Sequence, residues 1–182
     1  MKNFLKNIGL LLTFYSISLA QIDTTLKEYF PMEIGNVWEY EEDMFPDYWH
    51  YQIKITRDTI MPNGKKYLEY FNNGDPFYTK YYRMDDSLNV YQYKKFVCLE
   101  DSEYIRFKLT AKDSMSWLYC ISTDTHYVTL ITTKVVYYFN FGGSYKTKFY
   151  NEGTIRGWDN MAIRLAKGLG DVFSIFKVLH KS

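Results

Sequence analysis

The stretch YWHYQIKITR, residues 48–57, decides the fold class. Apolar and polar side chains alternate along it, as Trp49, Tyr51, Ile53 and Ile55 are separated by His50, Gln52, Lys54 and Thr56. Successive side chains of a β-strand point to opposite faces of the sheet, so this alternation predicts a strand with one apolar and one polar face. Residues 103–109 repeat the pattern and predict a second strand of the same kind.

Turn signals divide the rest of the chain into similar runs. Asn-Gly pairs at 63–64 and 73–74 and a Gly-Gly pair at 142–143 supply the positive φ angles that tight hairpin turns require. Because the connections are short, neighbouring strands should pair antiparallel. The strands that we expect cover residues 37–42, 48–57, 66–71, 77–84, 88–97, 103–109, 116–122, 127–139, 145–150, 161–166 and 171–179.

Two segments allow more than one interpretation. Residues 127–139 are apolar on both faces, which is typical of a central strand or of a strand that contains a bulge. Residues 159–169 fit a strand by their alternation, whereas two alanines in the segment favour a helix. The alternation and the glycines that follow favour the strand.

These patterns together predict one all-β domain over residues 21–182. We expect a single antiparallel meander that forms an open or closed barrel-like sheet of about ten strands, because closure limits exposed strand edges. Aromatic residues make up 20% of the chain, and nineteen of them are tyrosines. Such residues suit half-buried pleated surfaces, which agrees with a β-rich fold.

The first twenty residues have the pattern of a signal peptide. Lys2 and Lys6 precede a run of thirteen mostly apolar residues, and Ser18-Leu19-Ala20 ends it with small residues. The sequence therefore predicts a signal peptide over residues 1–20, a cut after Ala20 and a secreted or periplasmic protein. A membrane anchor is the alternative, but it needs roughly 20 apolar residues, so we expect no membrane span in the mature chain.

Charge narrows the choice of partners. The formal net charge is +1, and it falls to −1 without the two lysines of residues 1–20. Nucleic-acid binding depends on clustered Lys and Arg, so we expect no nucleic-acid partner. The expected partner is an envelope or extracellular ligand of unknown identity.

The chain has two cysteines, Cys98 and Cys120. Export would place them where disulfides persist, which favours a bridge between them. The alternative is two unpaired thiols, because a bond requires the two Cα atoms to lie within about 7 Å.

Two motifs lie close to the ends of the expected domain. They are YFPMEIGNVWEY, residues 29–40, and AKGLG, residues 166–170. The first resembles a Y-F-P-L-x-x-G-N-x-W-x-Y start found in uncharacterised secreted bacterial β-rich proteins, and the second is similar to the A-K-G-x-G end of the same set. Met32 replaces the usual Leu, and Asp171 follows where an apolar residue is commoner. The resemblance implies a secreted β-rich domain of unknown activity, so it assigns no catalytic residues.

The first motif also has a physical interpretation. Pro31 keeps Phe30 extended, and Gly35-Asn36 permits a tight turn before the next strand. Large aromatic residues in strands are usually part of the core. We therefore expect four packing residues in this motif, Phe30, Ile34, Trp38 and Tyr40.

The sequence contains no recognisable catalytic or metal motif, and we predict no cofactor. The three histidines lack the spacing of metal ligands, and no nucleophile signature is present. A glycosidase needs only two carboxylates about 5 to 10 Å apart, which leaves a glycan hydrolase as an alternative. The densest acidic cluster consists of Glu41, Glu42, Asp43 and Asp47, which a solvated hairpin loop also explains.

The excess of aromatic residues suggests a ligand-binding surface. The candidate residues are Tyr78, Tyr81, Tyr82, Tyr91 and Trp49. Exposed rings on neighbouring strands would form a strip that stacks on sugars, or line a cavity for an apolar ligand; ordinary cross-strand packing is the alternative. The leading hypothesis is a non-catalytic exported domain that binds a glycan or an apolar ligand. The alternatives are a glycan hydrolase and a structural envelope component.

Overall fold

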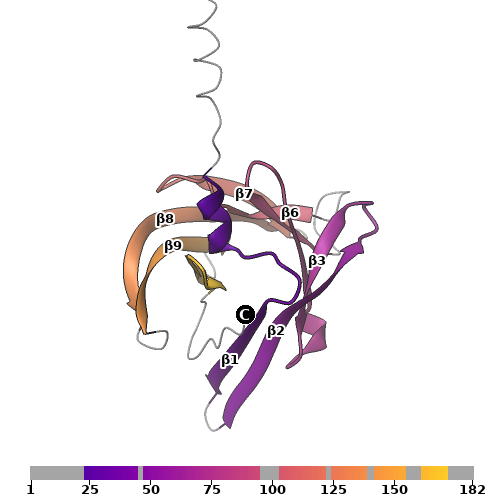
Figure 1. The fold of residues 1–182 in the computed structure, drawn as a ribbon. Coiled ribbons are helices and arrows are strands. Elements are labelled where there is room, and N and C mark those ends of the chain that lie inside the picture. Colours follow the sequence, from indigo (N-terminus) through magenta and orange to yellow (C-terminus); the bar gives the residue numbers. More distant parts are fainter. Residues whose placement is uncertain are drawn as a thin grey trace, which may run out of the picture.

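The computed structural model describes residues 23–44, 47–94, 103–121, 124–138, 142–154 and 161–171. Within them the chain forms eleven strands in two antiparallel sheets, with two short 3-10 turns (Figure 1). The first sheet has the order β1-β2-β3-β4-β5-β6 and the second β7-β8-β9-β10-β11. The all-β prediction is confirmed.

The strands of the first sheet are β1 (Val37–Met44), β2 (Asp47–Ile60), β3 (Lys66–Asn72), β4 (Lys80–Met84), β5 (Asn89–Tyr93) and β6 (Glu103–Lys108). Those of the second are β7 (Ser116–Ile121), β8 (Asp124–Tyr138), β9 (Gly143–Thr154), β10 (Met161–Ala166) and β11 (Gly170–Asp171). The 3-10 turns are η1 (Thr24–Tyr29) and η2 (Pro76–Tyr78).

The expectation of a single meander is wrong, because the chain changes sheets between β6 and β7. After β6 the Ala111 amide turns back to the Lys108 carbonyl at 3.1 Å, and Ser114 adopts a φ of +67°. The chain then pairs with β8 instead of β6, since Leu130 donates to the Met115 carbonyl at 3.0 Å. Among the described residues β6 and β7 share no ladder, so each sheet is an open meander of its own.

The two sheets face each other. Figure 1 shows β1 to β3 on one side of the molecule, β8 and β9 on the other, and β6 and β7 between them. β8 lies between β7 and β9, and its register shifts between Leu130 and Thr132, so it is both central and bulged, as its pattern allows. Residues 161–166 form a strand, which confirms that interpretation of the ambiguous segment.

Several expected strands begin or end at other residues than predicted. Residues 77–79 are not in a strand, because the Asp75 side chain accepts from the Phe77 amide at 2.9 Å and Pro76 starts the 3-10 turn η2. β9 is longer than residues 145–150 and keeps pairing with β8 along most of its length. The expected residues 95–97 and 172–179 lie outside the described residues.

The core lies between the inner faces of the two sheets. Phe107 of β6 contacts Phe30 and, across the sheets, Tyr150 of β9, with ring centroids 5.6 and 5.3 Å apart. Trp117 of β7 donates from its indole nitrogen to the Ile105 carbonyl of β6 at 3.1 Å. Rings and one indole hydrogen bond therefore hold the sheets together where the backbone ladder is interrupted.

An ion pair also crosses between the sheets. The Arg106 guanidinium lies 2.5 Å from the Glu152 carboxylate of β9, and both side chains are largely buried. The register of β5 and β6 shifts between Val90 and Tyr91, which leaves Arg106 as the extra residue of a bulge. The bulge lets this side chain leave the regular alternation and reach the other sheet.

The packing residues expected in the first motif are confirmed with one exception. Phe30 and Trp38 are buried and Tyr40 is half-buried, but Ile34 is 58% exposed. Ile34 lies in the turn closed by the Asn36 amide and the Glu33 carbonyl at 3.1 Å, which points it away from the core. Within the described part of the chain no helix has the length and apolar character to cross a bilayer.

Candidate functional site

The two sequence motifs, far apart in the chain, meet at one edge of the core. The Trp38 indole nitrogen donates to the Leu169 carbonyl at 2.8 Å, and this bond is buried. The Gly168 amide donates to the Glu28 carbonyl, also at 2.8 Å. We call these two hydrogen bonds the terminal clasp. They fix the segment before β1 against the β10–β11 turn.

Gly170 allows this close approach. A Cβ at this position would lie 3.4 Å from Pro31 Cδ and 3.7 Å from the Trp38 indole nitrogen. Gly170 also has a φ of +78°, a conformation that residues with side chains rarely adopt. The AKGLG motif therefore ends in a glycine because the backbone passes against the Pro31 and Trp38 side chains.

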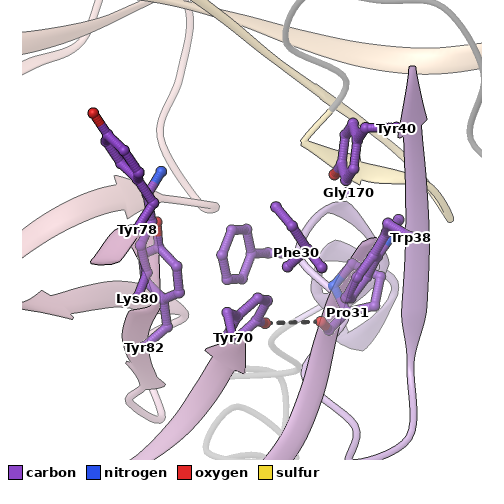
Figure 2. A pocket seen from close by; sticks show the side chains of 10 residues that line it. Phe30, Pro31, Trp38, Tyr40, Tyr70, Tyr78, Lys80, Tyr82 and Gly170 are labelled. Atoms are coloured by element: carbon purple, nitrogen blue, oxygen red, sulfur yellow. Dashed lines mark hydrogen bonds between the residues drawn. The ribbon is translucent and has the colours of Figure 1, made fainter. Parts of the chain in front are cut away.

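Next to the clasp lies a cavity of about 70 Å³, which we call the aromatic cavity (Figure 2). Its lining residues are Phe30, Pro31, Trp38, Tyr40, Ile53, Tyr70, Tyr78, Lys80, Tyr82 and Gly170. A cavity of about 150 Å³ can hold benzene, so this one admits a small apolar group. It is well below the roughly 300 Å³ or more of a site for a drug-sized molecule.

Strand alternation explains why the rings gather there. Trp38 lies directly opposite Ile53 in the β1–β2 register, and Tyr70 lies opposite Lys80 in the β3–β4 register. Tyr82 is two residues beyond Lys80 and shares its face of β4. The inner face of the first sheet thus supplies one wall of the cavity, and Phe30, Pro31 and Gly170 supply the other.

The walls of the aromatic cavity are ordered by ring packing. The Tyr70 hydroxyl donates to the Pro31 carbonyl at 3.0 Å, the bond drawn in Figure 2. Tyr70 also stacks on Trp38 with centroids 6.0 Å apart, and Phe30 meets Tyr82 edge to face at 5.1 Å. Burial raises the pKa of Tyr70 well above its usual value, so its hydroxyl stays protonated and keeps donating.

The tyrosines predicted to form one aromatic strip do not lie together. Tyr82 is buried in the aromatic cavity and Tyr78 is at its edge, but Tyr81 and Tyr91 are on the outer face of the first sheet. The reason is that neighbouring residues of a strand face opposite ways, so Tyr81 and Tyr82 diverge. The Trp49 side chain lies outside the described part of the structure.

The outer face of the first sheet carries a charged network. Glu103, 8% exposed, accepts from Arg83 Nε at 2.8 Å and Nη2 at 2.7 Å, from Lys65 Nζ at 2.5 Å, and from the Tyr67 hydroxyl. The Arg83 guanidinium also lies 3.9 Å from the centre of the Tyr91 ring. We call these residues the Glu103 network. Tyr91 is thus a stacking partner of Arg83 within the protein.

Electrostatics show that this network stays ionised. Burial alone would raise the pKa of Glu103, but the hydrogen bonds from Arg83, Lys65 and Tyr67 outweigh burial and lower it to about 2. The neighbouring Glu69 accepts from Thr56 and Arg57, and its pKa is also lowered. A general acid needs a raised pKa, so neither carboxylate suits the acid role in glycoside hydrolysis.

The described part of the structure includes only some of the other residues that the sequence singled out. Glu41, Glu42, Asp43 and Asp47 lie at the turn end of the β1–β2 hairpin by register, but their side chains are outside the described part. Cys98 is outside it too, and Cys120 lies in β7 without a described side chain, so the disulfide stays a prediction. Among the described residues no group of three metal-ligating side chains comes together.

Comparison with known proteins gives no relative. No protein-family description matches the chain, and neither a curated protein nor a solved structure matches it significantly. The resemblance of the two motifs to secreted β-rich proteins therefore stays a prediction.

Sequence reasoning missed most of the aromatic cavity. Phe30, Trp38 and Tyr40 were expected only as packing residues, and Lys80 and Gly170 were not expected at the site at all. One signal for the cavity was present in the sequence, namely the pair of motifs at residues 29–40 and 166–170. The two motifs lie close together in the structure, because each supplies part of the same wall of the aromatic cavity.

Replacing Trp38 by Phe should weaken the terminal clasp. The change keeps a ring but removes the donor to Leu169, which leaves a buried carbonyl unpaired and should lower the free energy of unfolding by about 1–3 kcal/mol. Urea unfolding measures the loss. Hydrogen exchange should show faster exchange at the Gly168 amide and unchanged exchange at the Leu130 amide; equal effects at both would contradict a local clasp.

Lowering the pH should destabilise the protein through Glu103. Its pKa is about 2 in the folded protein and 4.5 when unperturbed, so its stabilising contribution is complete above pH 4.5 and is lost as the pH falls towards 2. The loss should be about 2–3 kcal/mol. Urea unfolding from pH 6 to pH 2 should show that the free energy of unfolding depends less steeply on pH in Glu103→Gln than in the wild type. The control Glu33→Gln, at an exposed position, should follow the wild type. Parallel curves for all three proteins would contradict the role of Glu103.

Proposed function

We propose that this chain is an exported, non-catalytic β-domain that binds the apolar part of a ligand in the aromatic cavity. The observation that supports the proposal is a cavity lined by six aromatic rings and kept open by their mutual packing. Apolar lining that a partly open cavity leaves in contact with water forgoes the free energy that its burial would give. A cavity with ordered walls is therefore better explained by an occupant than by core packing alone.

The composition of the lining favours an apolar group over a sugar. A sugar needs several polar partners for its hydroxyl groups, and specific sites place such groups among the apolar ones. In the aromatic cavity the Tyr70 hydroxyl is already engaged by the Pro31 carbonyl. Phe30, Trp38 and Ile53 offer carbon surface to an occupant. Binding would gain roughly 25 cal/mol for each Å² of apolar surface removed from water.

Export is the second part of the proposal, and the sequence supports it. Residues 1–20 combine two lysines, an apolar run and a small-residue end, which is the pattern that signal peptidase cleaves. An exported protein would also meet an oxidising compartment, where Cys98 and Cys120 would form a disulfide.

Intact-mass measurement of the protein from the exported fraction of the producing cell tests this part. We expect a chain that starts at Gln21 and is lighter than its sequence by two hydrogens, because the cysteines are joined. A chain that starts at Met1 in the cell-associated fraction would contradict export. A mature chain with both hydrogens present would contradict only the disulfide.

Native mass spectrometry of the same material tests ligand binding. The wild type should carry an extra mass that denaturation releases, and Tyr78→Ala should carry it at lower occupancy, because Tyr78 is 66% exposed and lines the cavity. Losing one ring contact should weaken binding by up to about tenfold. The matched control is Phe77→Ala, since Phe77 lies in the same 3-10 turn, is 98% exposed and is not a lining residue. Equal occupancy in the two variants would contradict the site.

A further inference from the structure

One charged side chain lies at the edge of the aromatic cavity. Lys80 is exposed, directly opposite Tyr70 in the register of β3 and β4, and on the same face of β4 as Tyr82. Figure 2 shows its amine beside the Tyr78 ring, at the side of the cavity away from Trp38. We call Tyr78 and Lys80 the rim. An ammonium group thus borders a cavity whose other described lining residues are uncharged.

We propose that the occupant is an amphipathic anion, whose short apolar group enters the aromatic cavity and whose negatively charged headgroup meets the Lys80 ammonium at the rim. The proposal rests on the proposed function and adds the chemical class of the ligand to it. An ammonium group attracts an anion by charge and can donate a hydrogen bond to a carboxylate, sulfate or phosphate. Nearby rings exclude water on one side, which strengthens this attraction.

The size of the aromatic cavity sets the length of the apolar group. At about 70 Å³ the cavity has less than half of the volume that holds benzene, so only a few carbon atoms can enter. Longer chains must continue past the rim. Affinity should therefore rise about fourfold with each added methylene group while the cavity fills, and then level off.

A cationic ligand is the competing possibility. Aromatic faces attract cations, and cages of several rings bind quaternary ammonium groups in other proteins. At this site such a ligand would lie close to Lys80, and like charges repel each other most where water is partly excluded. The charge at the rim therefore favours an anion over a cation of the same shape.

Isothermal titration calorimetry with four probes of one chain length tests the proposal. The probes are octanoate, octyl sulfate, octanol and octylammonium, each used below its critical micelle concentration. The purified wild-type protein should bind the two anions about three- to tenfold more tightly than octanol, since a partly exposed charge pair adds modest affinity. Octylammonium should bind more weakly than octanol. A preference between octanoate and octyl sulfate would then identify the headgroup.

Variants of exposed lysines separate the charge effect from the cavity. Lys80→Gln should abolish the advantage of octanoate over octanol, and Lys80→Arg should retain it. The control Lys54→Gln removes an exposed lysine that lies on β2 and is not a lining residue, and it should bind all probes as the wild type does. Exposed substitutions of this kind change stability by no more than about 0.5 kcal/mol, so all three variants should fold.

The outcomes distinguish the inference from the proposed function. Equal affinities for octanoate and octanol would overturn the proposal that the ligand is an anion. An octanoate affinity that Lys80→Gln leaves unchanged would overturn it as well. If Tyr78→Ala still weakened octanol binding, the apolar site would stand. If none of the four probes bound the wild type, both the anion and the apolar site would be overturned. In a series from butanoate to decanoate, the affinity should rise with chain length and then level off. A constant gain in affinity per methylene group would indicate binding outside the aromatic cavity.

Discussion

The buried hydrogen bond from the Trp38 indole to the Leu169 carbonyl joins residues 131 positions apart, and the cavity depends on it. The first and second sheets are separate meanders that stay connected through the chain between β6 and β7. The terminal clasp links them again near the other end of the chain. Because closing so long a loop costs conformational entropy, the bond is useful only with the Phe30 and Trp38 packing beside it. The clasp thus holds Phe30 and Gly170, on one wall of the aromatic cavity, against Trp38 on the other.

The two faces of the first sheet carry different chemistry, and the period of two separates them. The inner face supplies rings to the core, whereas the outer face holds the Glu103 network. A buried carboxylate is tolerated only when donors satisfy it, and Glu103 has four such bonds from three side chains. Since these donors come from the β2–β3 turn and from β3 and β4, the network links β6 to three other parts of the sheet that carries the cavity.

Much of the strand pattern was predictable because it depends on local signals. Alternation located β2, β6 and β10, turn signals placed the strands around them, and the apolar pattern of residues 127–139 predicted a β8 that is central or bulged. The division into two sheets was not predictable, since it depends on a turn at residues 109–115 that has no Asn-Gly pair and includes Ser114 at positive φ. The aromatic cavity was missed for a similar reason: one wall comes from contacts between distant segments, which no local pattern encodes.

The edge of the aromatic cavity exists because the expected strand 77–84 begins three residues later, at Lys80. Had residues 77–79 continued β4, Tyr78 would have been one more residue of a flat ladder, on the same face as Lys80 and Tyr82. Instead the Asp75 cap and Pro76 bend the chain into η2, which packs against β3 and places Tyr78 at the edge of the space beside Lys80. The cap is formed by local hydrogen bonds, so it does not require an occupant. The η2 backbone that carries Tyr78 is therefore ordered without a ligand, and binding need not include the cost of ordering that backbone.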